Sequence, residues 1–207
     1  MELLILRHGL TRANLEHRFC GRTDWPLLPE SYLALDQLAQ SEELPRVDVA
    51  CHTGLARTRQ TAERLFPGVP MQVAPALSEF DFGDFEALTH EDLQDHPDYI
   101  RWLVDYETMA CPHGESRPEF IHRVRLGWQD LFSHWNSKPE INQTNARPVI
   151  EKAALVTHGG VIAVLMNDWF PGERDLLSWQ PACGTGYQVS FSAGLPVQLQ
   201  PFGARMT

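Results

Sequence analysis

The sequence has no long hydrophobic run. The apolar stretch near its start, residues 3–6 (L-L-I-L), spans only four residues before Arg7. A secretory signal needs an apolar segment of roughly 7–15 residues, and a membrane-spanning helix needs about 20. We therefore expect a cytoplasmic protein that is not inserted in a membrane.

Closely spaced cysteines are also absent. The four cysteines (Cys20, Cys51, Cys111 and Cys183) form no C-x-x-C pair. Isolated cysteines in a chain without a secretion signal are typical of reduced thiols. The sequence contains no H-E-x-x-H, so its nine histidines do not follow the spacing of a zinc hydrolase. We expect neither a metal ion nor a cofactor.

Positive charge is scarce. The chain has 17 Lys and Arg against 27 Asp and Glu, a formal net charge of −10. A general nucleic-acid-binding protein needs a basic surface, so nucleic acid is not an expected partner. An acidic protein can still bind an anion in a pocket that gathers its few positive groups. We expect a small-molecule partner, and a homodimer is left open.

The composition is otherwise that of a globular protein, with 43% hydrophobic and 21% charged residues. Short apolar runs alternate with stretches typical of helices, which favours an α/β fold: a three-layer α/β/α sandwich around a mostly parallel sheet. No repeat or linker divides the chain, so one domain is expected over residues 1–207. The predicted strands are 3–6, 47–50, 69–73, 153–157, 187–191 and 197–199, and the predicted helices are 32–40, 56–66, 89–93, 97–106, 117–135 and 160–169.

The last third of the chain differs from this alternating pattern. Turns at Gly184–Gly186 and Gly194–Pro196 predict two antiparallel strands at one edge of the sheet. The polar stretch 136–148 is expected to be a solvated loop.

Two apolar strands end in the same way, with a histidine followed by glycine. The first is L-I-L-R-H-G, ending at His8 and Gly9, and the second is L-V-T-H-G-G, which contains His158. Ligands of open α/β sheets bind outside the carboxyl ends of the strands. If these strands are neighbours, both histidines face one crevice, where glycine lets backbone amides approach an anion.

Two further segments supply charged groups. Arg57 falls in the first turn of the helix predicted from residue 56, although the helix dipole favours a cation at the other end. An anion bound there would explain this position. Glu79 lies among aromatic residues, an environment that raises the pKa of a carboxyl group and keeps its proton available near neutrality.

In this order, the segments resemble the histidine phosphatase superfamily, also called the phosphoglycerate mutase-like family. The resemblance covers residue 3 to about 165 and is most similar to the branch with α-ribazole phosphatases and broad-specificity phosphatases. It implies a phosphoglycerate mutase-like fold with a helical cap at about 80–116. The matching motifs are R-H-G-L-T-R-A-N (7–14), the following loop (19–27), T-G-L-A-R-T-R-Q-T-A (53–62), L-S-E-F-D-F-G-D-F-E (77–86), G-E-S (114–116) and V-T-H-G-G (156–160).

The resemblance implies a role for each matching position. His8 would be the nucleophile that becomes phosphohistidine, and Glu79 would be the proton donor. The groups around the phosphoryl oxygens would be Arg7, Arg57 and His158, completed by Thr11, Asn14 and the backbone near Gly21 and Gly159.

These residue types suit phosphoryl transfer. The reaction needs an in-line nucleophile and fixed positive charge around three oxygens, which arginines supply without a metal. A neutral imidazole is a nucleophile near pH 7, provided that its other nitrogen donates to a group such as a backbone carbonyl. A carboxylic acid can protonate the leaving alkoxide and then activate water. The implied function is metal-independent hydrolysis of a small phosphate ester, with α-ribazole 5′-phosphate as one candidate.

The chain departs from the family pattern at a few positions. Thr53 replaces a serine, and Ala87 and His113 replace glycines. His113 is interpreted either as an exposed loop residue or as part of the substrate entrance. Aromatic side chains are interpreted either as core or as stacking partners of a flat substrate: Trp25, Phe82, Phe85, Trp102 and Tyr106.

Three other functions remain as alternatives. A cofactor-dependent phosphoglycerate mutase shares the core motifs but carries a long insertion, whereas only residues 80–113 separate Glu79 from Gly114 here. A metal-dependent hydrolase lacks support from ligand spacing. A non-catalytic phosphate-binding module would need neither the nucleophile His8 nor the acid Glu79.

Overall fold

A six-stranded sheet forms the centre of the molecule. The computed structural model describes residues 1–136 and 149–203. The strand order is β3-β2-β4-β1-β5-β6, with the first four strands parallel and the last two antiparallel. This confirms the predicted mostly parallel sheet with an antiparallel edge. The strands are β1 (Glu2–Arg7), β2 (Val49–His52), β3 (Met71–Val73), β4 (Lys152–Thr157), β5 (Gly186–Ser192) and β6 (Leu195–Phe202).

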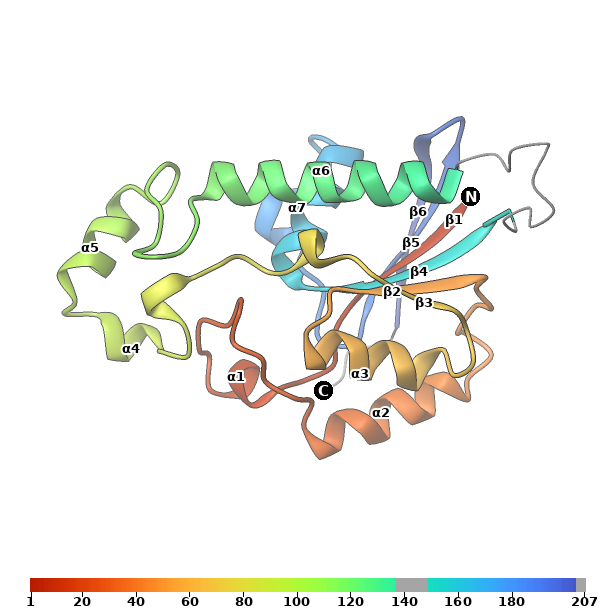
Figure 1. The fold of residues 1–207 in the computed structure, drawn as a ribbon, viewed down its shortest axis with the longest axis horizontal. Coiled ribbons are helices and arrows are strands. Elements are labelled where there is room, and N and C mark those ends of the chain that lie inside the picture. The colour runs from red at the N-terminus through yellow and green to blue at the C-terminus, as the bar shows by residue number, and fades with distance from the viewer. Residues whose placement is uncertain (137–148, 204–207) are drawn as a thin grey trace.

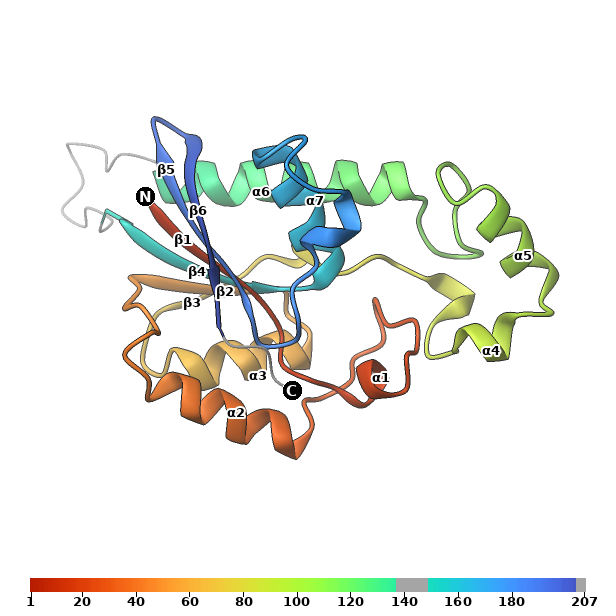
Figure 2. The same ribbon diagram turned by 180° about the vertical axis from the view of Figure 1, so that it is seen from behind.

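Helices cover both faces of the sheet. Figures 1 and 2 show α6 and α7 on one face, α2 and α3 on the other, and α4 and α5 beyond one end. In the described part of the chain, no helix is long and apolar enough to cross a membrane. The helices are α1 (Arg12–Leu15), α2 (Pro29–Ala39), α3 (Ala56–Leu65), α4 (His90–Leu93), α5 (Pro97–Val104), α6 (Arg117–Asn136) and α7 (Gly159–Trp169), with short 3-10 turns η1 (Pro75–Leu77), η2 (Gly83–Phe85) and η3 (Leu176–Trp179).

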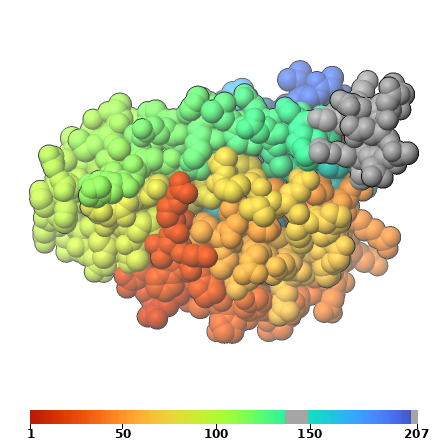
Figure 3. Space-filling model, in the orientation of Figure 1, coloured from red at the N-terminus to blue at the C-terminus, as the bar shows by residue number. Residues whose placement is uncertain are grey.

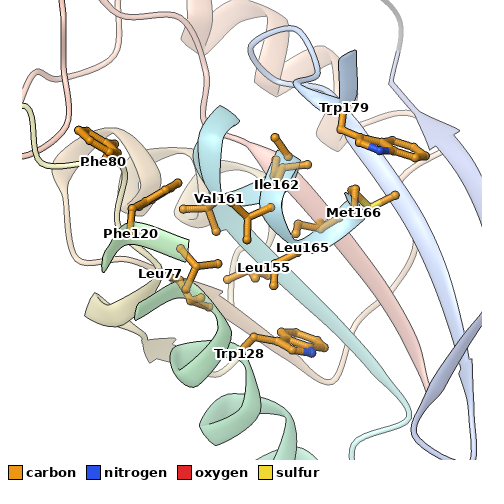
Figure 4. Packing of buried hydrophobic residues seen from close by; sticks show 14 of the residues in the cluster. Leu77, Phe80, Phe120, Trp128, Leu155, Val161, Ile162, Leu165, Met166 and Trp179 are labelled. Atoms are coloured by element: carbon orange, nitrogen blue, oxygen red, sulfur yellow. The ribbon is translucent and has the colours of Figure 1, made fainter. Parts of the chain in front are cut away.

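The apolar residues of β1 belong to two hydrophobic clusters, one on each face of the sheet. Side chains alternate across a strand, so Leu3 and Ile5 pack in the cluster beneath α6 and α7, while Leu4 and Leu6 pack in the cluster beneath α2 and α3. Figure 4 shows the first cluster, in which Phe120 and side chains of α7 pack together. Burial on both faces is what a parallel central strand requires.

Several predicted boundaries were wrong by a few residues. The strand predicted at 47–50 is Val49–His52, because pairing with β4 begins at Val49 and Asp48 instead binds the amides of Glu151 and Lys152. The turn predicted at Gly194–Pro196 is formed by Ala193 and Gly194, both with positive φ, and β6 already begins at Leu195.

Other differences concern short elements and the polar loop. The helix predicted at 32–40 begins at Pro29, since proline fits the first turn of a helix. Gly186, placed in a turn by the sequence, is the first residue of β5. Of the predicted loop 136–148, Asn136 ends α6, and residues 137–148 lie outside the described residues.

Residues 80–116, with α4 and α5, form an end segment whose aromatic residues continue the hydrophobic cluster beneath α6 and α7. Phe85, Tyr99 and Trp102 are each at most 3% exposed and contact one another edge-to-face or stacked. Phe19, from the loop after α1, packs edge-to-face on Tyr99 and Trp102. Figure 3 shows this end segment beside the N-terminal residues.

Gly186, the first residue of β5, lies at a close contact between β5 and β1. A Cβ on Gly186 would lie 1.9 Å from the carbonyl oxygen of Ile5, so Gly186→Ala must push β5 away from β1. We expect this change to lower the free energy of unfolding by about 1–3 kcal/mol in denaturant titrations.

The control is Ala193→Gly, in the turn before β6 where φ is 50°. Glycine adopts this conformation without steric cost, so its effect should stay within about 1 kcal/mol. An unchanged unfolding midpoint for Gly186→Ala would contradict the close contact.

Candidate active site

The two motif histidines meet at the carboxyl ends of neighbouring strands. Strands β1 and β4 pair in parallel with Arg7 opposite Thr157, so His8 and His158 follow at adjacent positions. Their ring centroids are 5.2 Å apart, and both side chains are buried. The two strands are neighbours, as the expectation required, and the two rings meet, but of the two histidines His8 lines the cavity and His158 does not.

The ring of His8 is oriented by the main chain. Its Nδ1 donates a hydrogen bond to the carbonyl oxygen of Gly9 at 2.7 Å, which leaves the lone pair on Nε2. Burial lowers the pKa of His8 well below its ordinary value, and the positive charges of Arg57 and Arg7 lower it further. The imidazole is therefore neutral near pH 7, with an unprotonated Nε2.

The ring of His158 contacts a side-chain hydroxyl group. Its Nε2 is 3.0 Å from the hydroxyl of Thr53, the position where the family pattern has serine. Its buried Nδ1 has no hydrogen-bond partner among residues 1–136 and 149–203. Burial and then the charge of Arg57 lower the pKa of His158 well below its ordinary value.

Arg57 is fully buried in the first turn of α3. It donates to the carbonyl oxygens of Thr23 at 2.8 Å and Gly21 at 2.7 Å. Arg7 donates to the carbonyl of Pro181 at 3.0 Å. The Nε of each arginine is buried with no partner in the described part of the chain. Buried unpaired donors cost free energy, which an anion bound between them would recover.

The carboxylate of Glu79 is anchored by backbone amides. Gly160, in the first turn of α7, donates to Oε2 at 2.9 Å, and Phe80 donates to Oε1 at 3.0 Å. Arg123 of α6 donates to the carbonyl of Glu79 and is paired with Glu115. These contacts hold Glu79 next to the helix that begins directly after His158.

A cavity of about 590 Å³ opens onto these groups. Arg7, His8, Asn14, Glu79 and Gly160 line its inner part. Arg57 and His158 lie behind this wall, fully buried. Further side chains of the wall are apolar, aromatic or basic: His17, Arg18, Phe19, Phe80, Phe82, Tyr106, Arg117, Phe120, Ile121 and Leu177.

The four predicted substrate-binding positions have different environments. Asn14 lines the cavity, and its Oδ1 accepts from both the amide and the hydroxyl of Thr11. Thr11 is buried and caps α1. The amide of Gly21 donates to Glu86 at 2.9 Å. Gly159 lies against Arg7, where a Cβ would be 3.4 Å from Cζ.

The structure shows where His113 and four of the five aromatic residues lie. The side chain of His113 is 85% exposed and pairs with Asp84 outside the cavity wall. Phe85 and Trp102 are core residues of the end segment, whereas Phe82 and Tyr106 line the cavity.

The sequence reasoning missed Glu86 and Arg123. Glu86 is the last residue of the acid-bearing motif (77–86), so the family resemblance already indicated that this position has a role. Arg123 lies in the middle of α6 and has no local sequence signal for its contacts with the carbonyls of Ala76 and Ser78. Among the described residues, no group of three His, Cys, Asp or Glu is placed to hold a metal ion.

Comparisons with known proteins identify the class. The model of the histidine phosphatase superfamily (branch 1) matches residues 3–185, so this chain belongs to that family.

Individual relatives include the adenosylcobalamin/alpha-ribazole phosphatase of Salmonella typhimurium, which is 28% identical over 80% of this chain and 78% of its own. The alpha-ribazole phosphatase structure from Shigella flexneri has a TM-score of 0.82 at 22% identity, covering 99% and 97% of the two chains. The phosphoglycerate mutase structure from Thermus thermophilus has a TM-score of 0.68 at 27% identity, covering 99% of each chain. Family membership and the Salmonella typhimurium relative support a phosphatase, and the two solved structures share the fold.

The buried histidines make stability depend on pH. The folded-state pKa values of His8, His158 and His52 are lowered, chiefly by burial, so the unfolded chain binds protons that the folded chain does not. The contribution of these histidines to the free energy of unfolding is therefore fully present above about pH 6.5. Below that pH the free energy of unfolding falls by up to about 1.4 kcal/mol per pH unit for each histidine.

Denaturant titrations between pH 7.5 and 5.5 measure this slope. His158→Gln should give a shallower slope, because it removes one group that binds a proton only in the unfolded chain. Equal slopes for the parent and His158→Gln would show that His158 is protonated in the folded protein.

Proposed function

We propose that this protein is a metal-independent phosphomonoesterase that forms a phosphohistidine on His8. The observation that carries the proposal is a neutral His8 with a free Nε2, next to three buried nitrogens without partners in the described chain, those of Arg7, Arg57 and His158. A phosphoryl group supplies acceptor oxygens for the two arginine nitrogens and negative charge beside the two guanidinium groups.

In the first step, Nε2 of His8 attacks the phosphorus atom. The P–N bond forms as the P–O bond to the alcohol breaks, and the alcohol oxygen takes the electron pair. Glu79, in its protonated form, gives this oxygen a proton, so a neutral alcohol leaves. Arg7 and Arg57 stabilise the charge on the three remaining oxygens.

In the second step, water replaces the histidine. The carboxylate of Glu79 accepts a proton from water as the water oxygen bonds to phosphorus and the P–N bond breaks. The electron pair returns to Nε2, inorganic phosphate leaves, and Glu79 is protonated for the next cycle. The carbonyl of Gly9 keeps the Nδ1 proton in place throughout.

The outer cavity wall favours an organic group with flat apolar surface. Phe82 and Tyr106 belong to residues 80–116, which we propose act as a cap over the site, and they face the cavity with Phe19 and Phe120. Aromatic walls stack well on a nucleobase-like ring. This supports α-ribazole 5′-phosphate, in keeping with the relatives, over a small sugar phosphate.

The second candidate is phosphoglycerate mutase activity, which the Thermus thermophilus structure's name brings forward. A mutase must return the phosphoryl group to its substrate instead of losing it to water. In the end segment, Arg101 pairs with Asp98, and Arg117 on the cavity wall pairs with Glu107. Arg117, the one of these two arginines on the cavity wall, thus already has a carboxylate partner, which favours the phosphatase.

A substrate panel tests the reaction class. With excess chelator, we expect the parent to release phosphate from p-nitrophenyl phosphate, α-ribazole 5′-phosphate or a sugar phosphate. His8→Ala should lower kcat by about 10³-fold or more, because it removes the nitrogen that forms the P–N bond. Phosphoglycerates are assayed for both release and isomerisation.

Circular dichroism of His8→Ala controls for folding. Activity near the parent level in this variant would eliminate the phosphohistidine mechanism. Isomerisation without release would assign the mutase reaction, and chelator-sensitive release would assign a metal enzyme.

Glu79→Gln tests the proton donor. The loss in kcat should be largest for esters of poorly acidic alcohols, about 10²–10⁴-fold, because these leaving groups need the proton. It should be smaller for p-nitrophenyl phosphate, whose leaving group is stable as an anion. An equal loss across the leaving-group series would instead assign Glu79 a positioning role.

A further inference from the structure

The loop from Cys20 to Thr23 is bound on one side by a single carboxylate. Oε1 of Glu86 accepts from the amides of Gly21 and Arg22, both at 2.9 Å. Oε2 accepts from the amide of Thr23 at 3.0 Å and from its hydroxyl at 2.6 Å. Three consecutive backbone donors thus point at one side chain, which belongs to the end segment.

The carbonyl groups of the same loop bind Arg57. Its guanidinium donates to the carbonyls of Gly21 at 2.7 Å and Thr23 at 2.8 Å, with a longer contact of 3.5 Å to Cys20. The loop therefore lies between an anion and a cation, with its amides toward Glu86 and its carbonyls toward Arg57. Because both charges bind the same peptide groups, a change in the position of Glu86 moves the loop and with it the guanidinium of Arg57.

We propose that Glu86 is a positioning residue that sets the guanidinium of Arg57 for phosphate binding through the loop Cys20–Thr23. This inference rests on the proposed function, because it assumes that the free Nε of Arg57 meets phosphate. Glu86 itself is absent from the cavity wall. It acts through peptide groups and does not touch the reacting atoms.

Apart from Glu86 and Arg57, the loop is held at its end, through the side chain of Arg22, and by a contact of 3.5 Å between Cys20 Sγ and the carbonyl oxygen of Thr23. Asp24 accepts from the amide of Ala56 at 2.7 Å, which ties the end of the loop to the start of α3. Arg22 pairs with Asp81 at 3.2 Å, but this pair is largely exposed and contributes little. The amides of Gly21, Arg22 and Thr23 depend on Glu86, so none of these contacts replaces it.

Gly21 is required at the point of closest approach. A Cβ there would lie 1.6 Å from the carbonyl oxygen of Phe80 and 2.8 Å from Oε1 of Glu86. The missing side chain allows the loop to contact the segment that carries Glu86. This gives Gly21 a role in the arrangement different from binding phosphate through its own amide.

The test is Glu86→Gln, which keeps the size of the side chain. Whichever way its amide is turned, the NH2 group faces at least one backbone N–H, and that hydrogen bond is lost. We expect the Kd for inorganic phosphate, measured by calorimetry, to rise about tenfold. In hydrolysis of p-nitrophenyl phosphate, KM should rise while the pH profile set by His8 is kept.

A double-mutant cycle separates positioning from general loosening. In an Arg57→Ala background, Glu86→Gln should weaken phosphate binding by less than about twofold, because the group that Glu86 positions is gone. The matched control is Asp48→Asn, which also removes a carboxylate bound to backbone amides but lies before β2. It should lower stability and leave the phosphate Kd unchanged.

Thr23→Val provides a second route if Glu86→Gln does not fold. It removes the hydroxyl that donates to Glu86 and should raise the phosphate Kd two- to fivefold, again only when Arg57 is present. An unchanged Kd in the variant that folds, or an equal loss with and without Arg57, would overturn the proposal.

The failure of the proposed function gives a different result. A parent protein that binds phosphate but hydrolyses no ester would refute the phosphatase and leave the test of Glu86 intact. A parent that binds no phosphate would overturn both. A parent that binds and hydrolyses, with Glu86→Gln unchanged in both assays, would overturn the inference alone.

Discussion

The site depends on two arginines, the buried Arg57 and the half-buried Arg7, neither of which forms an ion pair in the described part of the chain. Within the described residues, Arg7 and Arg57 are held by backbone carbonyls, whose partial charges offset only part of the cost of burying a cation. Pairing each arginine with an acid would stabilise the apoprotein and cancel the charge available to a ligand. The carbonyl contacts instead fix the direction of each guanidinium and leave an Nε free.

The same two charges determine the state of the histidines. They add to the effect of burial and keep the pKa values of His8 and His158 low, so the nucleophile is neutral without a carboxylate to orient it. The carbonyl of Gly9 takes that orienting role. Acidic groups near the site are bound by backbone amides, Glu79 through Gly160 and Glu86 through the loop 21–23. Main-chain dipoles thus separate the positive and negative side chains.

Local patterns in the sequence were enough to predict the sheet and the meeting of His8 with His158. The apolar runs of β1 and β4 and the H-G that follows each are local signals, and parallel pairing follows from the alternation of elements. Contacts between distant segments that carry no such local signal were not predictable. Glu86 and the loop 21–23 are separated by more than sixty residues, and the inward position of Arg123 depends on which carbonyls α6 passes. The boundary of β2 likewise depends on Asp48, a contact across the sheet.

The hydrogen bond from Gly160 to Glu79 joins the acid to the helix that His158 caps. Glu79 and His158 are therefore both attached to the start of α7, which directly follows β4. Part of the aromatic wall of the cavity, Phe82 and Tyr106, belongs to the end segment instead. Substitutions in that wall can change which organic group fits while the bond-breaking geometry stays constant. Such a division lets a lineage acquire new substrates without rebuilding its chemistry.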